Sequence, residues 1–533
     1  MRLRFPGVAA ALFVVSMGAH AQAADWWVDQ AAASGGDGSQ AKPFSTINDV
    51  KSVLKTGDTV WIKSGTYNET VDFWHVPAGT GGRTVIRAAP GASPVIDGGG
   101  ASGFVLQAGE TPDMTFRGLT VKNGDTGIEF YKADGGDVID CTTVGTGGSV
   151  AFYFASHGHV SGSKLEGSVS GKNTDGTIIE DNEIYGSGAE GITLHADSKN
   201  CRYSRNVVHD NSSVNVYLDS ISHSVVDSNL VYMSPGTKKT TVGIMLADES
   251  YPNVTAPVLT DITITNNVVI HNESGIRFWD GSFPGQSALE NVVIANNTVV
   301  DNKTTAIKWD AGPHQNTVVE NNIFAGESGQ QALLLQANST TGVTLDHNLW
   351  NLPGVQKPFL WSNTTYSHSG WSSATGQGAG DVSGAPAFSG AWDLPATNLE
   401  LTAGSPAVDK GKTLSSVTHD YNGAARPAGA GYDLGAFEYG ATAPAGGAGG
   451  ATGSGGATGS GGAGAGGNPA GGSGGQSSGS GGATTGGAAG TANNAASSGD
   501  SGGCGCRTGS RGPALPVWVF GFVVVLAARR RRR

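Results

Sequence analysis

Short alternations of apolar and polar residues recur through the middle of the chain, and many of them close on an asparagine. The six clearest phrases are TIIEDN, CRYSRN, SVVDSN, ITITNN, VVIANN and TVVENN, and VTLDHN is a weaker seventh. Successive closing asparagines lie 24, 23, 38, 30, 25 and 26 residues apart. They are Asn182, Asn206, Asn229, Asn267, Asn297, Asn322 and Asn348.

This spacing predicts a solenoid built from strands. Repeats of about 20 to 50 residues are typical of solenoids, in which each unit buries its apolar face only against its neighbours. Alternating runs rich in Val, Ile and Thr predict strands, and helical periodicity is absent from these units. Stacked coils bring their asparagines together, so that the side-chain amides hydrogen-bond along the stack. We therefore expect an all-β, single-stranded parallel β-helix.

The N-terminal part of the exported chain has a recognisable layout. Pro43–Ile47, Gly57–Val60 and Gly65–Glu69 read PFSTI, GDTV and GTYNE. These motifs resemble the opening of secreted right-handed β-helix proteins of the pectate-lyase-like superfamily. The resemblance implies a right-handed β-helix. Pro43 is expected to open an amphipathic helix that caps the first coil, with its apolar face formed by Phe44, Ile47, Val50, Val53 and Leu54.

Composition divides the chain into five segments. Basic residues, an apolar run and small residues predict a secretory signal peptide at residues 1–23. The β-helix is expected at 24–350 and a β-rich closing module at 351–440. Residues 441–503 are almost wholly Gly, Ala, Ser and Thr and predict a disordered linker. Residues 504–533 form a separate C-terminal signal.

This C-terminal signal combines Cys504 and Cys506, an apolar stretch at residues 514–528 and a terminal cluster of arginines. It resembles the myxobacterial-type sorting signals called MYXO-CTERM. The resemblance implies processing near the cysteines and display of a secreted protein on the outer face of a bacterial cell. In this view the short apolar stretch is a transmembrane segment. A plain tail anchor is the alternative.

The closing module resembles a C-terminal module of surface-anchored β-helix proteins. Its marks are Ser405–Asp409 and Asp433–Glu438. We interpret its charged residues as turn and cap residues rather than as a catalytic set, because no cleft is predicted beside them. These residues are Asp409, Asp420, Arg426, Asp433 and Glu438.

Charge limits the partners of this chain. The formal net charge is −12, but nine of the 32 basic residues lie in the signal peptide and the tail. The exported part therefore carries 23 basic against 44 acidic residues, a formal charge of −21. Such a surface argues against nucleic acid as a partner. A polyanionic substrate would require a local cationic site or bound Ca²⁺. Cys141 and Cys201 fall in non-adjacent coils, so we expect no disulfide, and we expect a monomer.

A second strand follows each asparagine phrase and carries the candidate chemistry. Alternate residues of these strands are apolar and are expected to face inward, as in Ile276/Phe278 and Ile307/Trp309. The residues between them face outward, about 4.8 Å from their neighbours in the next coil. One outward column reads Thr193, Tyr217, Met245, Arg277, Lys308 and Leu334; the next reads His195, Asp219, Ala247, Trp279, Asp310 and Gln336.

This face suits β-elimination of an acidic sugar. The reaction needs a base for the proton beside the carboxyl group and a cation to neutralise that group. In right-handed β-helix lyases, which the N-terminal motifs resemble, a Lys or Arg is usually the base and acid-bound Ca²⁺ often neutralises the carboxylate. By position, Lys308 or Arg277 would be the base. The candidate substrate-binding residues are Tyr217, Trp279 and His195, and the candidate Ca²⁺ ligands are Asp219, Asp248, Glu249, Asp280 and Asp310.

The lengths of the loops also indicate a site at these coils. The interval from Asn229 to Asn267 exceeds a 24-residue coil by fourteen residues, and the next interval by six. The extra residues, at 234–241, 249–260 and 281–289, are expected to wall a groove. The alternative is that these outward charges only solvate the surface, with Arg277 and Lys308 paired to Asp219 and Asp310.

Two further patterns are weaker. Asn173–Gly176 matches a polygalacturonase signature, but His157-Gly158-His159 precedes it and that family's later Asp-Asp and Arg-Ile-Lys are missing. We therefore predict an inter-coil turn at Asn173–Gly176. The second pattern is an outward set on earlier coils that would either extend a sugar-binding surface or pack near the cap: Glu129, Tyr131, Tyr153 and His157.

Together these features predict a secreted, surface-displayed polysaccharide lyase of the pectate or uronate type. Its partner would be an acidic polysaccharide. The alternative is a non-catalytic surface protein that binds glycan or mediates adhesion.

Overall fold

The computed structural model describes residues 22–237, 241–310, 312–326 and 340–444, and for residues 331–335 the course of the backbone alone. All of them belong to one of the two units of the chain, and the other, residues 454–507, lies outside them. Nearly all of the predicted signal peptide and linker and all of the sorting signal also lie outside the described residues. Within the described ranges, no helix is long and apolar enough to span a membrane.

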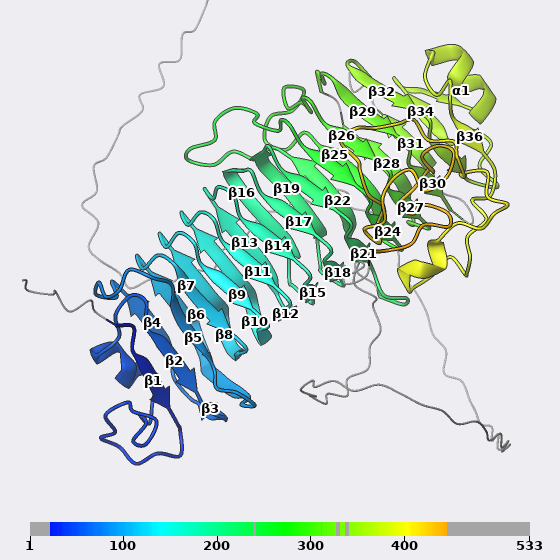
Figure 1. Ribbon diagram of the computed structural model, residues 1–533. Coiled ribbons are helices and arrows are strands. Elements are labelled where there is room, and N and C mark those ends of the chain that lie inside the picture. Colours follow the sequence, from blue (N-terminus) through cyan, green and yellow to red (C-terminus); the bar gives the residue numbers. More distant parts are fainter. Residues whose placement is uncertain (1–21, 238–240, 311, 327–330, 336–339, 445–533) are drawn as a thin grey trace, which may run out of the picture. The chain divides into compact units, whose positions relative to one another are not determined.

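The strands stack in parallel, coil upon coil, as the repeats predict (Figure 1). One sheet takes a single strand from each coil; we call it the first sheet. Its thirteen strands are β1 (Asp25–Val28), β2 (Thr59–Ile62), β5 (Thr84–Ala88), β7 (Met114–Arg117), β9 (Asp137–Ile139), β11 (His159–Ser161), β14 (Ile178–Glu180), β17 (Arg202–Ser204), β20 (Val225–Asp227), β23 (Thr263–Thr265), β26 (Val293–Ala295), β29 (Thr317–Glu320) and β32 (Val343–Asp346).

The other strands form two ribbons, here called the second and third ribbons. The long strands β6 (Pro94–Gly109), β8 (Thr120–Tyr131) and β10 (Thr142–Tyr153) run through both. The second ribbon also contains β3 (Gly65–Tyr67), β12 (Lys164–Glu166), β15 (Glu183–Tyr185), β18 (Val207–His209), β21 (Leu230–Tyr232), β24 (Val268–Ile270), β27 (Thr298–Val300), β30 (Ile323–Ala325), β33 (Leu349–Asn351) and β36 (Val382–Ser383).

The third ribbon carries the predicted site. Its strands pair in parallel from β4 to β34, and the hairpin β34–β35 at its end is antiparallel. Besides the long strands it contains β4 (Val71–Trp74), β13 (Ser168–Lys172), β16 (Ile192–Lys199), β19 (Val214–Ser222), β22 (Val242–Ala247), β25 (Ser274–Trp279), β28 (Thr305–Trp309), β31 (Gln331–Leu335), β34 (Phe359–Trp361) and β35 (Thr364–Tyr366).

The core lies inside the coils, in the predicted register. The inward residues of β16, β19, β22, β25 and β28 are all 0% exposed. They are Ile192, Leu194, Val216, Leu218, Ile244, Leu246, Ile276, Phe278, Ile307 and Trp309. The sixth predicted pair, Leu333 and Leu335, falls where side chains are not described. Cys141 and Cys201 are buried free thiols.

The asparagine ladder is confirmed in every rung from Asn182 to Asn348. Each side-chain amide donates to the side-chain carbonyl of the next asparagine at 2.9–3.0 Å. The same carbonyl accepts the backbone N–H of the asparagine before it. The ladder therefore satisfies buried backbone groups at each bend as well as its own amides.

A second ladder follows the bend between the second and third ribbons, and the sequence analysis overlooked it. Asn215 Nδ2 donates to Asn272 Oδ1 at 2.9 Å, and Asn272 Nδ2 donates to Asn302 Oδ1 at 3.2 Å. Asn211 joins by donating to Asn215 at 2.9 Å. The signal was present, because Asn211, Asn272 and Asn302 each stand five residues after a first-ladder asparagine.

The predicted N-terminal capping helix does not form. The segment contains only a 3-10 turn, Asn48–Ser52. The backbone N–H groups of Ile47 and Asn48 donate to the Glu69 carboxylate, at 2.8 and 3.1 Å, and such side-chain acceptors compete with helical hydrogen bonds. The apolar residues that suggested the helix still cover the first coil, because all of them except Val53 are at most 8% exposed.

A helix covers the core at the C-terminal end instead. Helix α1 (His368–Thr375) begins at Ser367, whose hydroxyl accepts the Gly370 N–H. Its Trp371 is 0% exposed and stacks on Phe359 with ring centroids 4.7 Å apart. This helix lies within the segment predicted to be β-rich.

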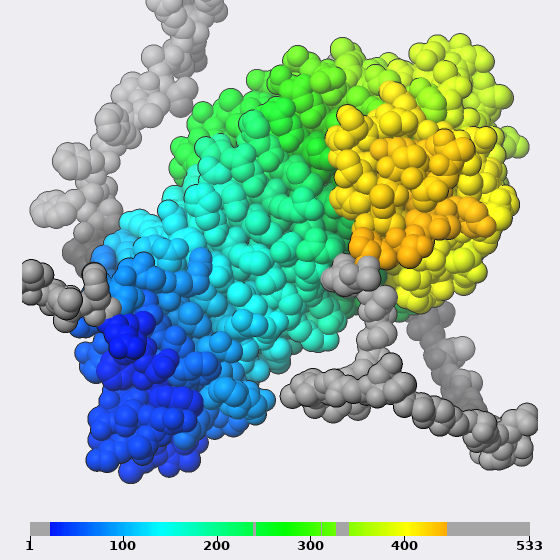
Figure 2. All heavy atoms as spheres, in the orientation of Figure 1, coloured from blue at the N-terminus to red at the C-terminus, as the bar shows by residue number. Residues whose placement is uncertain are grey.

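After β36 the chain folds back along the side of the stack, through the 3-10 turn η2 (Ala396–Leu399) and a series of tight turns. Figure 2 shows this segment, in yellow and orange, against the green coils. Leu399, Tyr421 and Phe437 pack on outward apolar residues of β18, β21 and β24, and Leu401 and Leu434 pack on those of β27 and β30. The module therefore covers the second ribbon laterally.

The charged residues of the module have the predicted turn and capping roles. The Asp420 carboxylate accepts backbone N–H groups of Asn422, Ala424 and Glu438. Asp433 accepts those of Asp409 and Tyr439. The side chains of Arg426 and Glu438 are 0% exposed and form an ion pair at 2.5 Å.

Candidate functional site

The outward columns of the third ribbon have the predicted register. Met245 pairs with Arg277, and Arg277 pairs with Lys308, on adjacent strands β22, β25 and β28. In the neighbouring column His195 pairs with Asp219. The backbones of Arg277 and Lys308 therefore lie about 4.8 Å apart, with both side chains on the same face.

Arg277 and Lys308 differ in their partners. Arg277 Nη2 lies 3.4 Å from Asp310 Oδ2, so this ion pair, which the surface-solvation alternative anticipates, does form. Arg277 Nε is buried and has no hydrogen-bond partner among the described residues. No described acidic side chain lies within ion-pair distance of Lys308. The Arg277 guanidinium is thus partly paired, whereas the Lys308 ammonium group has no salt bridge to the described residues.

Trp279 and Asp280 lie beside this cationic pair. Trp279 is half-buried and packs against the apolar cluster around Met245. Asp280 accepts the Gly285 N–H at 3.3 Å. Burial raises the pKa of Asp280, and the Asp310 charge raises it further while Arg277 opposes both.

The inserted loop at residues 249–260 folds over β16 and β19. The Tyr217 hydroxyl donates to Glu249 at 2.9 Å, and the Tyr251 hydroxyl donates to the Asp219 carboxylate. The Tyr251 ring also packs on His195, with centroids 5.0 Å apart. The loop therefore joins two residues of its own to three candidate site residues of the ribbon.

Covering by this loop changes the predicted role of Tyr217. Tyr217 is 2% exposed and Met245 4%, and both belong to one buried apolar cluster. The Tyr217 ring consequently has no solvent-facing side on which a sugar could stack. Its hydroxyl remains in the polar network with Glu249.

Burial shifts the titration of the covered groups in opposite directions. Burial raises the pKa of Asp219 to about 7; the Tyr251 hydrogen bond opposes this rise and the Glu249 charge adds to it. Burial also raises the pKa of Glu249. His195 has its pKa lowered to about 4, by burial first and by the Lys172 charge second. At neutral pH His195 is therefore uncharged beside a carboxyl group that is close to its midpoint.

Asp248 anchors the loops instead of facing the substrate side. It is 0% exposed, and its carboxylate accepts the Ser287 hydroxyl at 2.5 Å and the Val258 N–H at 3.0 Å. Gly281 packs directly against its backbone: a Cβ at Gly281 would lie 1.7 Å from the Asp248 carbonyl oxygen. Asp248 thus fixes the loops at 249–260 and 281–289 to each other.

The five candidate Ca²⁺ ligands do not converge. Asp219 and Glu249 belong to the covered network, Asp280 and Asp310 lie beside Arg277, and Asp248 is used by the loops. Within the described ranges, no group of three or more His, Cys, Asp or Glu side chains is arranged to hold a metal ion. The residues present do not fit a Ca²⁺ site of the predicted composition.

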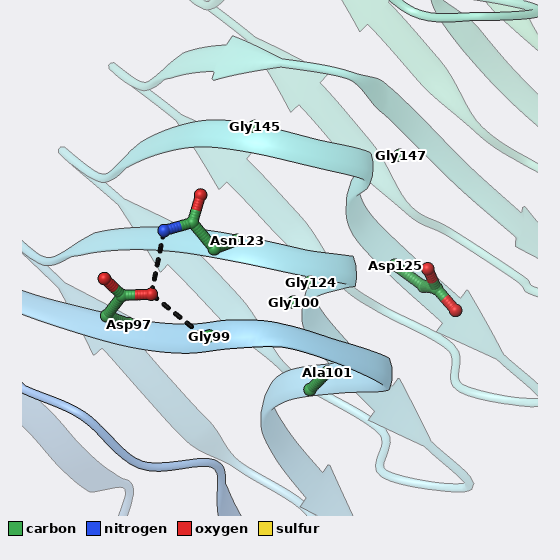
Figure 3. A pocket seen from close by; sticks show the side chains of 9 residues that line it. All are labelled: Asp97, Gly99, Gly100, Ala101, Asn123, Gly124, Asp125, Gly145 and Gly147. Atoms are coloured by element: carbon green, nitrogen blue, oxygen red, sulfur yellow. Dashed lines mark hydrogen bonds between the residues drawn. The ribbon is translucent and has the colours of Figure 1, made fainter.

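A polar hollow of about 690 Å³ lies elsewhere, at the bend in β6, β8 and β10 (Figure 3). Glycines line most of it, together with Asp97, Asn123 and Asp125. The Asp97 carboxylate pairs with Lys122 at 3.0 Å and accepts hydrogen bonds from Asn123 and the Gly99 N–H. None of the residues that line the hollow is cationic, so it lacks the group that would neutralise a sugar carboxylate.

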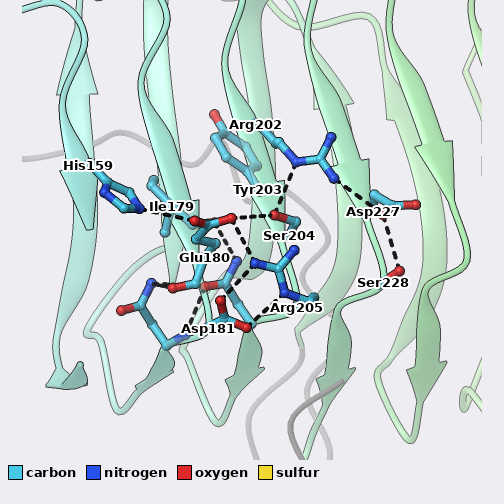
Figure 4. A network of polar contacts seen from close by, with 12 residues as sticks. His159, Ile179, Glu180, Asp181, Arg202, Tyr203, Ser204, Arg205, Asp227 and Ser228 are labelled. Carbon is cyan, nitrogen blue, oxygen red and sulfur yellow. Dashed lines mark hydrogen bonds and ion pairs between the residues drawn. The ribbon is translucent and has the colours of Figure 1, made fainter. Parts of the chain in front are cut away.

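A charged network on the first sheet is structural. Arg205 pairs with Glu180 at 2.8 Å and with Asp181 at 2.7 Å, and His159 also contacts Glu180 (Figure 4). On the next strands Asp227 is held by Arg202 at 3.6 Å and by His419 of the closing module at 3.0 Å. These groups neutralise one another and connect the coils to the module.

The structure also shows where the two weaker sequence patterns lie. Asn173–Gly176 forms the turn between β13 and β14, as predicted, with Asn173 in the left-handed region at φ 53°. Glu129, Tyr131 and Tyr153 lie on the third ribbon, and their register pairs them with outward residues of adjacent strands. His157 lies away from them, in the bend after β10.

Tyr251 is the main site residue that the sequence reasoning missed. Its only sequence signal was its place in an inserted segment, because periodicity says nothing about where an insertion folds. The companion insertion at residues 234–241 includes residues 238–240, which lie outside the described ranges.

A family profile supports the architecture. The family profile described as "right handed beta helix region" matches residues 167–323, which include the candidate site. The coils form a right-handed parallel β-helix. Among solved structures, pectate lyase Pel9A is similar at 16% identity and TM-score 0.44, covering 78% of this chain and 96% of that one. The A-module of mannuronan C-5 epimerase AlgE6 from Azotobacter vinelandii is similar at 15% identity and TM-score 0.41, covering 64% and 93%.

A third similar structure is XylC in complex with xylose, at 12% identity and TM-score 0.41, covering 64% of this chain and 86% of that one. No curated protein matches the sequence. Likeness at these identities concerns the fold alone and does not indicate a function.

Proposed function

We propose that the protein cleaves an acidic polysaccharide by β-elimination on the outward face of β25 and β28. The observation that carries the proposal is the adjacency of Arg277 and Lys308, with Trp279 beside them, on a chain of formal charge −12. An acidic sugar approaching a negatively charged surface needs such a local cationic site.

The two cations have different roles in this proposal. A guanidinium stays protonated in proteins, so Arg277 binds and neutralises the sugar carboxylate. An amine has an accessible neutral form, so Lys308 removes the proton from the carbon that bears the carboxylate. That electron pair forms a double bond to the neighbouring carbon, whose bond to the glycosidic oxygen breaks. The leaving oxygen then takes a proton from the Lys308 ammonium group or from water.

The neighbouring groups have supporting roles. Trp279 offers a half-exposed ring for stacking, and the partly exposed His195 and Glu249 provide hydrogen-bonding groups along the same face. Tyr217 supports the site indirectly, because its hydroxyl donates to Glu249 and holds that carboxylate in place. No step is routed through Ca²⁺, because the described carboxylates do not form a site for it.

Incubation of the exported domain with a panel of polyuronides tests this assignment, with the absorbance of unsaturated products as readout. We expect products from at least one polyuronide. We expect Lys308→Ala and Arg277→Ala each to lower the rate by about 10²- to 10⁴-fold, the usual contribution of an acid–base or charge-stabilising group. A parallel series with a chelator tests the Ca²⁺ prediction independently.

A matched control is Lys164→Ala. Lys164 is an exposed lysine of the second ribbon that pairs with Glu183 at 2.8 Å, so its loss should leave the rate unchanged. Products absent across the whole panel would overturn the lyase assignment. Full activity in both Lys308→Ala and Arg277→Ala would overturn the site.

The second candidate function is glycan binding without turnover. The ion pair between Arg277 and Asp310 favours it, because a base–cation pair committed to catalysis would not need this internal neutralisation. Retention of the wild-type protein by polyuronides in the absence of unsaturated products would support this function over the lyase.

Export and surface display are part of the same proposal. The predicted signal peptide and C-terminal signal support secretion and attachment at the outer face of the cell through residues 504–533, and we propose that the protein is a monomer there. Mass spectrometry of the mature protein should find the terminal arginine cluster absent, and an intact tail would contradict processing.

A further inference from the structure

Aromatic side chains gather on the N-terminal coils of the third ribbon, on β4, β8 and β10 (blue to cyan in Figure 1). In the outward column, register pairs Trp74 with Gly109, Gly109 with Tyr131, and Tyr131 with Tyr153. The Trp74 and Tyr131 rings are stacked with centroids 5.9 Å apart. Trp74 is 42% exposed, which is unusual for the largest apolar side chain.

Gly109 makes this stacking possible. A Cβ at Gly109 would lie 2.0 Å from the Trp74 ring. The missing side chain leaves the space in which the indole lies flat across β6 and reaches the ring of Tyr131 two strands away. The stacking of the two rings therefore depends on three residues, Trp74, Gly109 and Tyr131.

The edge of the strands adds a second row. His75, Glu110, Lys132 and Phe154 follow the last residues of β4, β6, β8 and β10, and all four are in the left-handed region, with φ between 44° and 55°. Each donates its backbone N–H to the coil that follows. This conformation is costly for residues other than glycine. Its repetition holds four side chains at one edge, including Phe154, which is 46% exposed.

Two cations lie on these rings. Lys132 Nζ lies 5.1 Å from the Tyr131 ring centroid and also pairs with Glu110 at 3.3 Å, so a sugar carboxylate would replace Glu110 as its partner. Lys172 Nζ lies 5.3 Å from that of Tyr153 and 5.4 Å from that of Phe154. We call the set Trp74, Tyr131, Tyr153, Phe154, Lys132 and Lys172 the aromatic strip.

Polar groups in the adjacent column complete the surface. Asp72, Gln107 and Glu129 pair in register on β4, β6 and β8, and Gln107 Nε2 donates to Glu129. Asp72 Oδ1 is buried and has no hydrogen-bond partner among the described residues. A row of carboxyl and amide groups beside aromatic rings is the combination that sugar hydroxyls and the apolar faces of sugar rings require.

We propose that the aromatic strip is a non-catalytic binding surface for acidic polysaccharide. The rings stack on the sugar faces, and Lys132 and Lys172 bind the sugar carboxylates. The combination of groups selects this occupant. Bare rings alone would suit a protein partner equally well, whereas rings beside a row of hydrogen-bonding groups suit a sugar, and Lys172, which forms no salt bridge to a described acidic side chain, provides a cation for its carboxylate. The inference rests on the proposed function for its substrate class.

The strip also lies in line with the proposed catalytic face. In register, its outward column continues from Tyr153 through Lys172 and His195 to Asp219, where the 249–260 loop lies over it, so a polymer that reaches the catalytic face passes along the outside of this loop. From β10 to β28 there are six strand spacings, or about 29 Å. One polymer chain that contacts both places must span this distance, so short oligosaccharides can occupy only one of them.

Affinity electrophoresis of the exported domain in gels that contain a polyuronide tests the strip without requiring turnover. We expect Trp74→Ala and Phe154→Ala each to weaken polymer binding by at least about tenfold. The matched control is Tyr439→Ala, an aromatic residue that is 41% exposed but lies in the closing module; it should bind as the wild type does. Lys132→Met with Lys172→Met should weaken binding to the polyuronide but not to a neutral glucan.

The outcomes separate this inference from the proposed function. Strip variants that melt at the wild-type temperature and bind the polyuronide with wild-type affinity would overturn the strip, whatever Lys308→Ala does to turnover. A wild-type protein that no polyuronide retards would overturn it too. Binding that depends on Trp74 and Phe154, in a protein that releases no unsaturated product, would support the strip and overturn the lyase.

Discussion

At the scale of single residues, Asp219 is a buried carboxyl group whose ionisation destabilises the folded protein. It is 2% exposed, and burial raises its pKa from 3.8 to about 7. The folded state therefore binds more protons than the unfolded state between these values, and stability falls as the pH rises from 3.8 to about 7. Above that range the full cost of the buried charge is present. A buried carboxyl group that lowers stability is expected beside a functional site when the function requires it.

The substitution Asp219→Asn tests this reading. The amide keeps the shape but cannot ionise, so we expect it to stabilise the protein at pH 8 by about 2–4 kcal/mol and to have little effect at pH 3.5. Activity on polyuronides should fall in the same variant. Thermal unfolding at the two pH values measures the difference, and equal destabilisation at both would contradict the assigned titration.

At the scale of elements, a buried arginine, Arg426, fixes the closing module to the stack. Arg426 donates to Glu438 within the module, and it also donates to Asn266 of the β-helix at 3.1 Å. Removing one partner of a buried pair leaves the other charge uncompensated, so Arg426→Met should cost about 3–5 kcal/mol. The exposed pair of Lys164 and Glu183 is the comparison, and Lys164→Met should cost less than about 1 kcal/mol. Similar losses in a chemical denaturation series would contradict this account of the module.

The secondary-structure elements differ in how well the sequence predicted them. The asparagine ladder predicted the strands and their register, because a period and an alternation are local patterns that stacking preserves. The capping helix failed because Glu69, a residue distant in sequence, takes the N–H groups of Ile47 and Asn48. The position of the closing module was not predictable in the same way, since apolar outward residues such as Leu230 and Val268 only become evident as a docking surface once the coils are built.

At the scale of the whole chain, the candidate site was predicted in part. Arg277 and Lys308 are neighbours on one face because the register fixed them there. The contacts of Tyr251 with His195 and Asp219 were not predictable, because they depend on the direction in which an insertion folds. The predicted Ca²⁺ cluster did not account for Asp248, which two loops use as an anchor.

The described face therefore has two distinct regions along one ribbon. The aromatic strip lies on the first coils, and the cationic pair lies on later ones, with the covered network of Asp219 and Glu249 between them. Both regions are proposed to contact one polymer, because they lie on the same face of one ribbon, on either side of the 249–260 loop.

The most direct test of this account is a crystal structure of the Lys308→Ala variant with an acidic oligosaccharide longer than about 38 Å, the span of the eight strand spacings from β4 to β25. We predict a sugar chain that crosses the strands of the third ribbon, with one carboxylate on Arg277 and sugar rings on Trp74 and Tyr131. An ordered oligosaccharide bound elsewhere, such as in the glycine-lined hollow beside Asp97, would contradict it.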